Sequence, residues 1–428
     1  MGKFIGDWST QLKGYNKNVR LFLLSSIFGH IGMGIFMIIY NYYIRELGFD
    51  DQVNGKIIAM TATAQAVMLL PAGIISDRVG RKKIIFGGAI LFALTLFARS
   101  IFIDESLLLT AAFLSGLFMA FIMVSTIPLL AENSNEKQRV HLFSFNFAIM
   151  MVANVVGNLL GGGLSDFFQM AFSLDPVTSI RITLLIGAAF FFASVIPLAK
   201  IHEHKKTAKQ VKERKSYFKL IKTNKKAVKI ILLFAVAQII IGFGSGLVIP
   251  YLNLYFSDRF EVSNSLVGVI LSLGQAMTAV ALLIGPSVVA RVGEVRAVVF
   301  LQLASIPFLL LTAFTENLTL AVLGFLFRQA LMNAGNPIQM SLMMRSVDDS
   351  MKGLANSVGQ MVFSLGWAVM GPVSTGIVMI YGAYYGYAIV FSITGGLYVI
   401  ASVYFFLIFR NIDKQRMEEV SVTTKPAG

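Results

Sequence analysis

Eleven residues near the start of the chain, Gly73-Ile-Ile-Ser-Asp-Arg-Val-Gly-Arg-Lys-Lys83, join two long apolar segments and decide the fold. They hold one acid, four bases and two glycines. Gly73 suits close contact between two helices, and Gly80 suits a turn with positive φ. Asp77 has no partner at a fixed distance within the loop. We therefore expect its carboxylate to meet the free N–H groups of a helix N-terminus.

The composition indicates a membrane protein. The chain has 428 residues, of which 56% are hydrophobic and 14% charged, and its mean hydropathy is +0.74. Soluble domains carry about 25% charged residues. We therefore predict an all-α membrane protein with about twelve transmembrane helices, since runs of about 20 apolar residues cross a bilayer. The runs fall at 20–44, 54–76, 84–103, 106–131, 140–165, 179–199, 230–256, 264–290, 296–315, 318–344, 353–379 and 384–409.

Much of the net charge of +14 lies in residues 200–229, between the sixth and seventh runs. No aromatic interleaving or nucleic-acid module accompanies these bases, so we expect them to face the anionic inner leaflet rather than nucleic acid. The loops on the opposite side of the membrane carry few bases, which predicts that both termini are cytoplasmic. The chain has no cysteine, which excludes disulfides and thiolate metal sites.

The opening loop resembles G-x-x-x-D-R-x-G-R-K/R, the signature between helices 2 and 3 of the major facilitator superfamily. The matching positions are Gly73, Asp77, Arg78, Gly80, Arg81 and Lys82. The resemblance covers about residues 15–412 and implies two pseudo-symmetric six-helix bundles joined by a cytoplasmic linker. The implied domains are an N-terminal bundle at 1–199, a basic linker at 200–229, a C-terminal bundle at 230–410 and a cytoplasmic tail at 411–428.

Within the superfamily, the chain is most similar in pattern to bacterial multidrug and metabolite efflux members. This similarity implies a multi-pass protein of a bacterial or archaeal plasma membrane. The second half contains a degenerate repeat of the loop. Gly293 follows the second span of the second half, and Gly80 follows the second span of the first half. Ala290 stands where the repeat would need the acid.

The resemblance also implies a gate on the cytoplasmic side. We expect Asp77 to cap the N-terminus of the eleventh span, near Lys352, when the transporter opens outward. Arg81 is expected to pair with Glu132 at the cytoplasmic end of the fourth span, as the superfamily's loop arginine meets an acid there. The residues of this expected lock are Gly73, Asp77, Arg78, Gly80, Arg81 and Glu132.

Polar residues inside the apolar runs predict a substrate cavity. Arg328 lies near the midplane of the tenth span, where an arginine costs about 2.5–3.5 kcal/mol and needs water or a partner. His30 lies at nearly the same depth in the first span. In the superfamily, spans 1, 4, 7 and 10 surround the central cavity, so the resemblance and the polar stripes indicate one place. The candidates are His30, Asn41, Gln238, Gln275, Arg328, Asn333, Asn336 and Gln339.

Each candidate also has a structural interpretation. Arg328 suits a role in holding helix ends or carbonyl groups, and His30 suits a neutral imidazole hydrogen-bonded between helices. The amide side chains are as well suited to joining helices as to binding a ligand. Pro337 interrupts the backbone hydrogen bonds of the tenth span and predicts either a hinge or a static kink.

Departures from the family pattern bear on coupling and substrate. Ala112 replaces the arginine of the R-x-x-x-G pattern in the fourth span, and Asn158 replaces the proline of G-P-x-x-G-G in the fifth. No Asp or Glu lies in the middle of a predicted span, so a buried carboxylate relay has no candidate. A cavity with Arg328 and His30 but no acid favours neutral, amphipathic or anionic solutes.

The sequence therefore predicts a secondary active transporter that moves a small organic, amphipathic solute by alternating access, with efflux by proton antiport as the leading interpretation. The alternatives are uptake of a small organic anion, a lipid or lysolipid flippase, and a non-transporting membrane receptor. The chain lacks the phosphate-binding loop of a nucleotide-driven pump. Its four histidines and lack of paired acids argue against an enzyme. We expect a monomer in the lipid bilayer with a small-molecule substrate, no metal and no cofactor, and coupling to a proton gradient.

Overall fold

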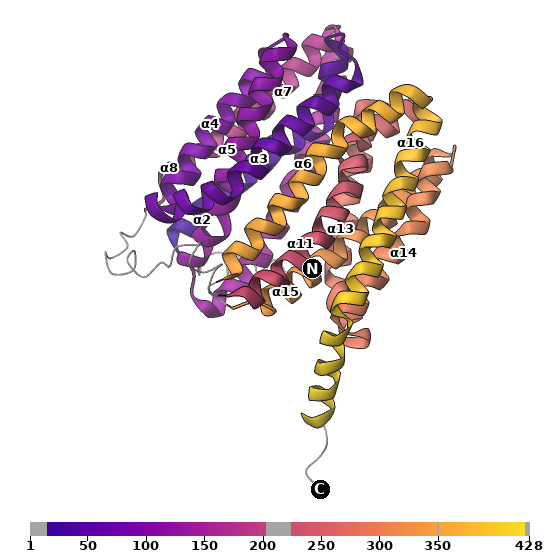
Figure 1. Cartoon of the computed structure of the whole chain (residues 1–428). Coiled ribbons are helices and arrows are strands. Elements are labelled where there is room, and N and C mark those ends of the chain that lie inside the picture. The colour runs from indigo at the N-terminus through magenta and orange to yellow at the C-terminus, as the bar shows by residue number, and fades with distance from the viewer. Residues whose placement is uncertain (1–14, 203–223, 349–350, 424–428) are drawn as a thin grey trace, which may run out of the picture. The chain divides into compact units, whose positions relative to one another are not determined.

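The computed structural model describes residues 15–202, 224–348 and 351–423, and every regular element in these ranges is a helix (Figure 1). Most of the predicted linker at 200–229 lies outside the description, as do the side chains of the predicted tail from residue 411. The helices of the first half are α2 (Lys17–Glu46), α3 (Asp51–Val79), α4 (Arg81–Ile101), α5 (Glu105–Glu132), α6 (Glu136–Phe172), α7 (Pro176–Ala193) and α8 (Val195–Ala199). Those of the second half are α11 (Lys225–Val248), η1 (Ile249–Tyr251), α12 (Leu252–Phe260), α13 (Asn264–Val292), α14 (Glu294–Phe314), α15 (Leu318–Arg345) and α16 (Lys352–Thr423).

Eleven helices in the described ranges are long and apolar enough to cross a membrane. The last of them, α16, contains two helices that meet at Gly382, where φ is 73°. Residues 352–381 and 383–410 are each long enough to span a bilayer. The predicted all-α fold with about twelve transmembrane helices is therefore confirmed, and each predicted run overlaps one span, with ends that differ by up to seven residues.

The starts of many spans follow from the local sequence. Five residues accept hydrogen bonds from backbone N–H groups in the first turn of the helix that follows them: Asn16, Asp50, Asp104, Asp175 and Asn317. These bonds satisfy donors that have no partner within the helix. Hydrogen bonds from the side chain and the backbone of Thr178 hold the pKa of Asp175 below its ordinary value.

Prolines account for two interruptions. Helix α7 gives way to α8 at Ser194, because Pro197 has no N–H to donate to the carbonyl of Ala193. The short 3₁₀ turn η1, which contains Pro250, separates α11 from α12. The sixth and seventh spans are therefore each built from two helical pieces.

The chain divides into two compact units, which we describe separately. Unit 1 comprises residues 1–53, 60–214 and 263–272, and unit 2 comprises residues 54–59, 215–262 and 273–428. The first turns of α13 therefore belong to unit 1, although the sequence assigns α13 to the second set of six spans. The predicted division into bundle, linker, bundle and tail stays a prediction.

The core of unit 1 forms where α2 packs on α6 and α7, and where α4 packs on α5 and α7. Glycine is required at the α2 contacts. A Cβ on Gly32 would lie 2.5 Å from the carbonyl oxygen of Gly187, and one on Gly157 would lie 2.3 Å from that of Ile31. Backbones that approach this closely pack well in a bilayer, where helix association depends on van der Waals contact.

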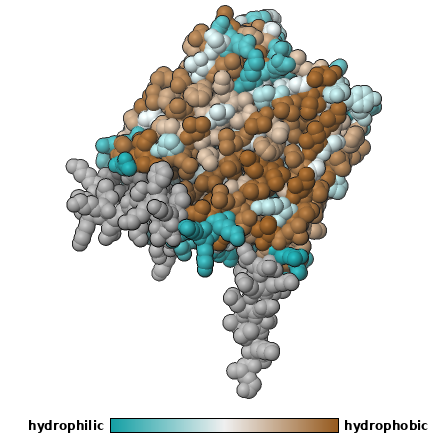
Figure 2. Space-filling model, in the orientation of Figure 1, coloured by the Kyte–Doolittle hydropathy of each residue, from teal (hydrophilic) through white to brown (hydrophobic). Residues whose placement is uncertain are grey.

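In unit 2, α11 packs on α16, and α14 packs on α15 and α16. Large aromatic side chains fill this core, and several are fully buried: Phe234, Tyr255, Phe256, Phe391 and Tyr398. The outer helix faces are apolar as well. Figure 2 shows hydrophobic residues over most of the visible face, and many exposed side chains are Leu, Ile, Val and Phe. Soluble monomers rarely expose apolar area on this scale, so these faces suit lipid.

Candidate functional site

The signature loop ties together the ends of three helices in unit 1. Gly80, with φ of 116°, ends α3 and begins α4. Arg81 is 9% exposed, and its Nε lies 3.7 Å from Oε1 of Glu132 at the end of α5. The same guanidinium donates to Oγ of Ser76 at 3.2 Å, and Ser76 shares a 2.7 Å hydrogen bond with Ser125 of α5. The expected pair of Arg81 and Glu132 is present, and its role in gating stays a prediction.

The remaining residues of the expected lock are less constrained. A Cβ on Gly73 would meet no atom within 4 Å among the described residues, so the expected close helix contact is wrong. Arg78 is exposed at the C-terminal end of α3, where a cation suits the helix dipole. The side chain of Asp77 and residues 349–350, just before α16, lie outside the described residues, so the predicted cap remains a prediction.

Unit 2 contains a matching ion pair with reversed polarity. Gly293, with φ of 87°, ends α13 and is followed by Glu294, which pairs with Arg345 at the end of α15. Glu294 follows Gly293 as Arg81 follows Gly80, and Arg345 ends the fourth span of its half as Glu132 does. Sequence reasoning noted the degenerate repeat at Gly293 but missed this pair. The two residues of each pair are separated by the same number of positions in the sequence, and this spacing could have revealed the second pair. Because the acid and the base exchange places between the two pairs, the similarity was concealed.

His30 belongs to a polar contact between α2 and α6. Its Nδ1 lies 3.4 Å from Nδ2 of Asn154. Nearby, Asn158 is 1% exposed, and in the orientation that satisfies its amide it donates to the carbonyl oxygens of Asn154 and Gly34 at 3.2 Å each. The asparagine that replaces the family's proline therefore joins two helices of unit 1.

Arg328 lies inside unit 2 and is 3% exposed. It donates from one terminal nitrogen to the hydroxyl of Tyr398 at 2.8 Å and from the other to Oε1 of Gln329 at 3.0 Å. Its Nε has no hydrogen-bond partner in the described structure, and no ion pair joins the guanidinium to a carboxylate there. The positive charge is therefore held by neutral groups, and the Nε donor is left without a partner among the described residues.

The amides of α15 form a second group in unit 2. Asn336 donates to Asn333 at 3.3 Å, and Asn333 donates to the hydroxyl of Thr278 on α13 at 3.4 Å. Gln339 is 1% exposed, and neither polar atom of its side chain has a partner among the described residues. Pro337 lies within α15, which stays helical on both sides of it. The hinge and the static kink therefore both remain open.

The other candidates lie on the predicted helices. Asn41 is buried in α2, whereas Gln238 of α11 and Gln275 of α13 are half-buried. The structure thus brings the candidates together in three groups: His30 with Asn154, Arg328 with Tyr398, and Asn333 with Asn336. Five of the residues that complete these groups and the signature loop were not identified from the sequence: Ser76, Ser125, Asn154, Thr278 and Tyr398. The described residues contain no group of three or more His, Asp or Glu side chains that could hold a metal ion.

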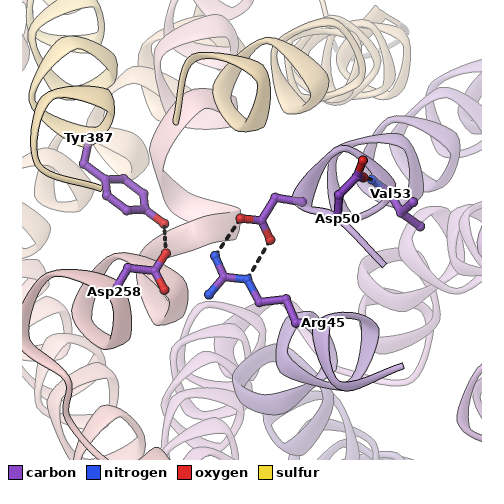
Figure 3. A network of polar contacts seen from close by, with 6 residues as sticks. Arg45, Asp50, Val53, Asp258 and Tyr387 are labelled. Carbon is purple, nitrogen blue, oxygen red and sulfur yellow. Dashed lines mark hydrogen bonds and ion pairs between the residues drawn. The ribbon is translucent and has the colours of Figure 1, made fainter. Parts of the chain in front are cut away.

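At the opposite end of the helices, charged side chains hold the turns in place (Figure 3). Arg45, at the end of α2, makes two hydrogen bonds of 2.6 and 2.7 Å to the carboxylate of Asp51 on α3. In unit 2, the hydroxyl of Tyr387 donates to Asp258 at 2.9 Å. In the sequence these three residues are only charges near predicted loops, whereas the structure gives each a fixed partner.

Comparison with known families gives a match along most of the chain. The family model described as "Major Facilitator Superfamily" matches residues 22–241 and 234–427. The quinolone resistance protein NorA of Staphylococcus aureus is 22% identical over 249 residues, which are 58% of this chain and 61% of that protein. Multidrug resistance protein 2 of Bacillus subtilis is 24% identical over 204 residues, 46% of this chain and 50% of that protein. The matched regions thus span between half and three fifths of these curated relatives.

Solved structures agree with the fold. The nucleoside transporter NupG aligns with a TM-score of 0.72 at 17% identity and covers 92% of this chain and 99% of that one. A bacterial homologue of the human lysosomal transporter Spinster aligns with a TM-score of 0.73 at 16% identity and covers 92% of this chain and 96% of that one. At these identities the likeness establishes the fold alone.

Proposed function

Because the chain belongs to the major facilitator superfamily, we propose that it is a secondary transporter that exports a small amphipathic solute by alternating access. This proposal rests on the buried polar side chains of α15. Placing a polar or charged side chain inside a membrane span costs free energy, and such residues mark substrate pathways. The relatives named for quinolone and multidrug resistance support export as the direction. The same family membership argues for transport rather than enzymatic catalysis.

The chemistry of the candidate groups limits the substrate class. Arg328 carries a charge that no described carboxylate neutralises, and the hydroxyl, imidazole and amide groups around the candidates are neutral. Such a site suits neutral or anionic amphipathic molecules better than cations. Uptake of a small organic anion is the second candidate, and the unneutralised guanidinium of Arg328 is the observation that favours it.

We further propose that the protein is a monomer in a plasma membrane with both termini in the cytoplasm. In this orientation, the basic segment at 200–229 faces anionic lipid of the inner leaflet. Coupling to a proton gradient is part of the proposal and needs no further cofactor.

Flux measurements in proteoliposomes test the proposal. The purified protein is reconstituted, a pH gradient of either sign is imposed, and cationic, anionic and neutral aromatic probes are compared. Gradient-dependent export of anionic or neutral probes is the expected result. Cation-selective export would contradict the charge argument, and gradient-driven entry of anions alone would favour uptake.

His30 is the candidate for proton coupling, because it is the titratable side chain among the predicted cavity residues. We expect His30→Gln to abolish the dependence of flux on external pH and to preserve binding of neutral probes. Glutamine keeps hydrogen-bonding capacity toward Asn154 but does not take up a proton near neutral pH. An unchanged pH profile would remove His30 from the coupling step.

The signature acid gives another test of alternating access. We expect Asp77→Asn to lower flux about tenfold, because the loss of a charge that caps a helix N-terminus weakens the inward-closed state. Expression and thermal stability should stay close to those of the parent. Asp104→Asn is the matched control, since Asp104 caps α5 from its own loop. Parental flux in the Asp77 variant would end the proposed lock.

A further inference from the structure

Helix α6 and the first turns of α13 make an unusually close contact within unit 1. A Cβ on Gly162 of α6 would lie 2.2 Å from the carbonyl oxygen of Asn264, and a Cβ on Gly268 of α13 would lie 2.7 Å from that of Asn158. Side chains larger than hydrogen are therefore excluded at both positions. The two helices meet backbone to backbone, which is the contact that small residues permit in membranes.

Hydrogen bonds run along the same contact. The backbone N–H of Ser265 donates to Oδ2 of Asp166 at 2.8 Å, and the hydroxyl of Ser265 donates to the carbonyl of Gly162 at 3.4 Å. Further along α13, the hydroxyl of Ser272 donates to the carbonyl of Val155 at 3.2 Å. Asp166 makes the shortest of these bonds, and it is the one that carries a charge.

Asp166 supplies the acidic side chain that the first turn of α13 lacks. Helix α13 has no acid in its first turn. The hydroxyl of Ser263 accepts from Leu266 at 3.3 Å and satisfies one N–H group, whereas the N–H of Ser265 is satisfied by Asp166 from another helix. A carboxylate is the favoured partner at this position, because it interacts with both the free N–H group and the helix dipole.

The position of this cap in the molecule indicates its use. Helix α6 begins at Glu136, shortly after Glu132 of the signature-loop ion pair, and carries Asp166 near its other end. The signature loop and Asp166 therefore lie at opposite ends of unit 1. The capped helix α13 is part of the second set of six spans in the sequence, yet its residues 263–272 pack within unit 1.

We propose that Asp166 is a gating residue at the end of the transporter opposite the signature loop. Its carboxylate holds the start of α13 against α6 while that end is closed, and it releases the N–H of Ser265 when that end opens. The role mirrors the one proposed for Asp77, with a different helix pair. The inference rests on the proposed alternating-access function.

The absence of cysteine makes a direct test practical. Single-cysteine Asn264→Cys protein is labelled in proteoliposomes with a membrane-impermeant maleimide, in the parent background and with Asp166→Ala. The expected result is labelling about fivefold faster with Asp166→Ala, the effect of losing one helix cap. Asp175→Ala is the matched control, since Asp175 caps α7 within the first set of spans and should leave the rate unchanged. Equal rates for the two variants would overturn the proposal.

A cross-link tests whether the contact must open. Oγ of Ser165 lies 3.4 Å from Nδ2 of Asn264, so Ser165→Cys with Asn264→Cys is expected to form a disulfide on oxidation. Flux should fall at least tenfold and return on reduction, whereas each single variant should keep its flux after oxidation. Full flux in the cross-linked protein would overturn the gate. Asp166→Asn removes the charge of the side chain but keeps an acceptor oxygen. It replaces Asp166→Ala in the labelling experiment if Asp166→Ala does not fold.

The two readouts also separate this inference from the function on which it rests. If the parent moves no probe in either direction, the proposed transport fails. The labelling rates still report whether Asp166 holds the contact closed.

Discussion

Arg328→Gln is expected to reduce flux of anionic and neutral probes about 10- to 100-fold. The estimate follows from the loss of a charged hydrogen bond to substrate, worth about 1.5–3 kcal/mol. Arg328 is 3% exposed, and its two hydrogen bonds run to the neutral groups of Tyr398 and Gln329, so no described carboxylate neutralises its charge. Initial rates in proteoliposomes measure the effect on each probe.

Companion variants separate binding from structure. Arg328→Lys keeps the charge but loses the planar fork, so we expect intermediate flux of anions. Tyr398→Phe removes the hydroxyl that accepts a hydrogen bond from the guanidinium of Arg328, and this variant should lower flux a few-fold. Arg259→Gln is the matched control, because Arg259 stacks on Tyr384 and donates to backbone carbonyls near the helix ends. Parental flux in Arg328→Gln would assign Arg328 to a structural role.

Exchanging the charges of the two ion pairs is expected to change stability in opposite directions. In unit 1, Arg81 lies at the N-terminus of α4 and Glu132 at the C-terminus of α5, so both charges oppose the helix dipoles. In unit 2, Glu294 lies at the N-terminus of α14 and Arg345 at the C-terminus of α15, so both charges suit the dipoles. From the helix dipoles alone, we therefore expect the first pair to release more readily than the second.

The reversal Arg81→Glu with Glu132→Arg should stabilise the fold by about 1–4 kcal/mol, because each charge near a helix end contributes about 0.3–1 kcal/mol and both change sign. We expect it also to slow flux, since the contact would release less readily. The reversal Glu294→Arg with Arg345→Glu should lower stability by a similar amount. Thermal unfolding in detergent measures both. Shifts of the same sign would contradict the dipole argument.

A single change provides the control for each exchange. Arg81→Glu places two like charges together and should lower both stability and flux, and the added Glu132→Arg should recover stability. The penalty should be smaller than for a fully buried pair, because the side chain of Glu132 is 35% exposed. Failure of the second change to recover stability would show that the ion pair does not hold the loop.

Several features of the fold could be predicted because they depend on neighbouring residues. The length of an apolar run fixes whether it can cross a bilayer, and the residue before a helix fixes its cap. The runs and the turn at Gly80 therefore agree with the structure. The close contact expected at Gly73 was wrong, because a glycine permits an approach but does not bring a second helix to it.

The sequence by itself determined the membrane class, the number and limits of the spans, and the loop that identifies the family. Each of these features depends on residues that lie close together, within a segment no longer than one span. Apart from Arg81 and Glu132, whose pairing the family resemblance implied, only the tertiary structure decided the partners. Arg328 meets Tyr398 across 70 positions, Asp166 meets Ser265 across 99, and Glu294 meets Arg345 across 51. No local window contains both members of such a pair. Packing of whole helices brings them together, and so it assigns each polar side chain its role.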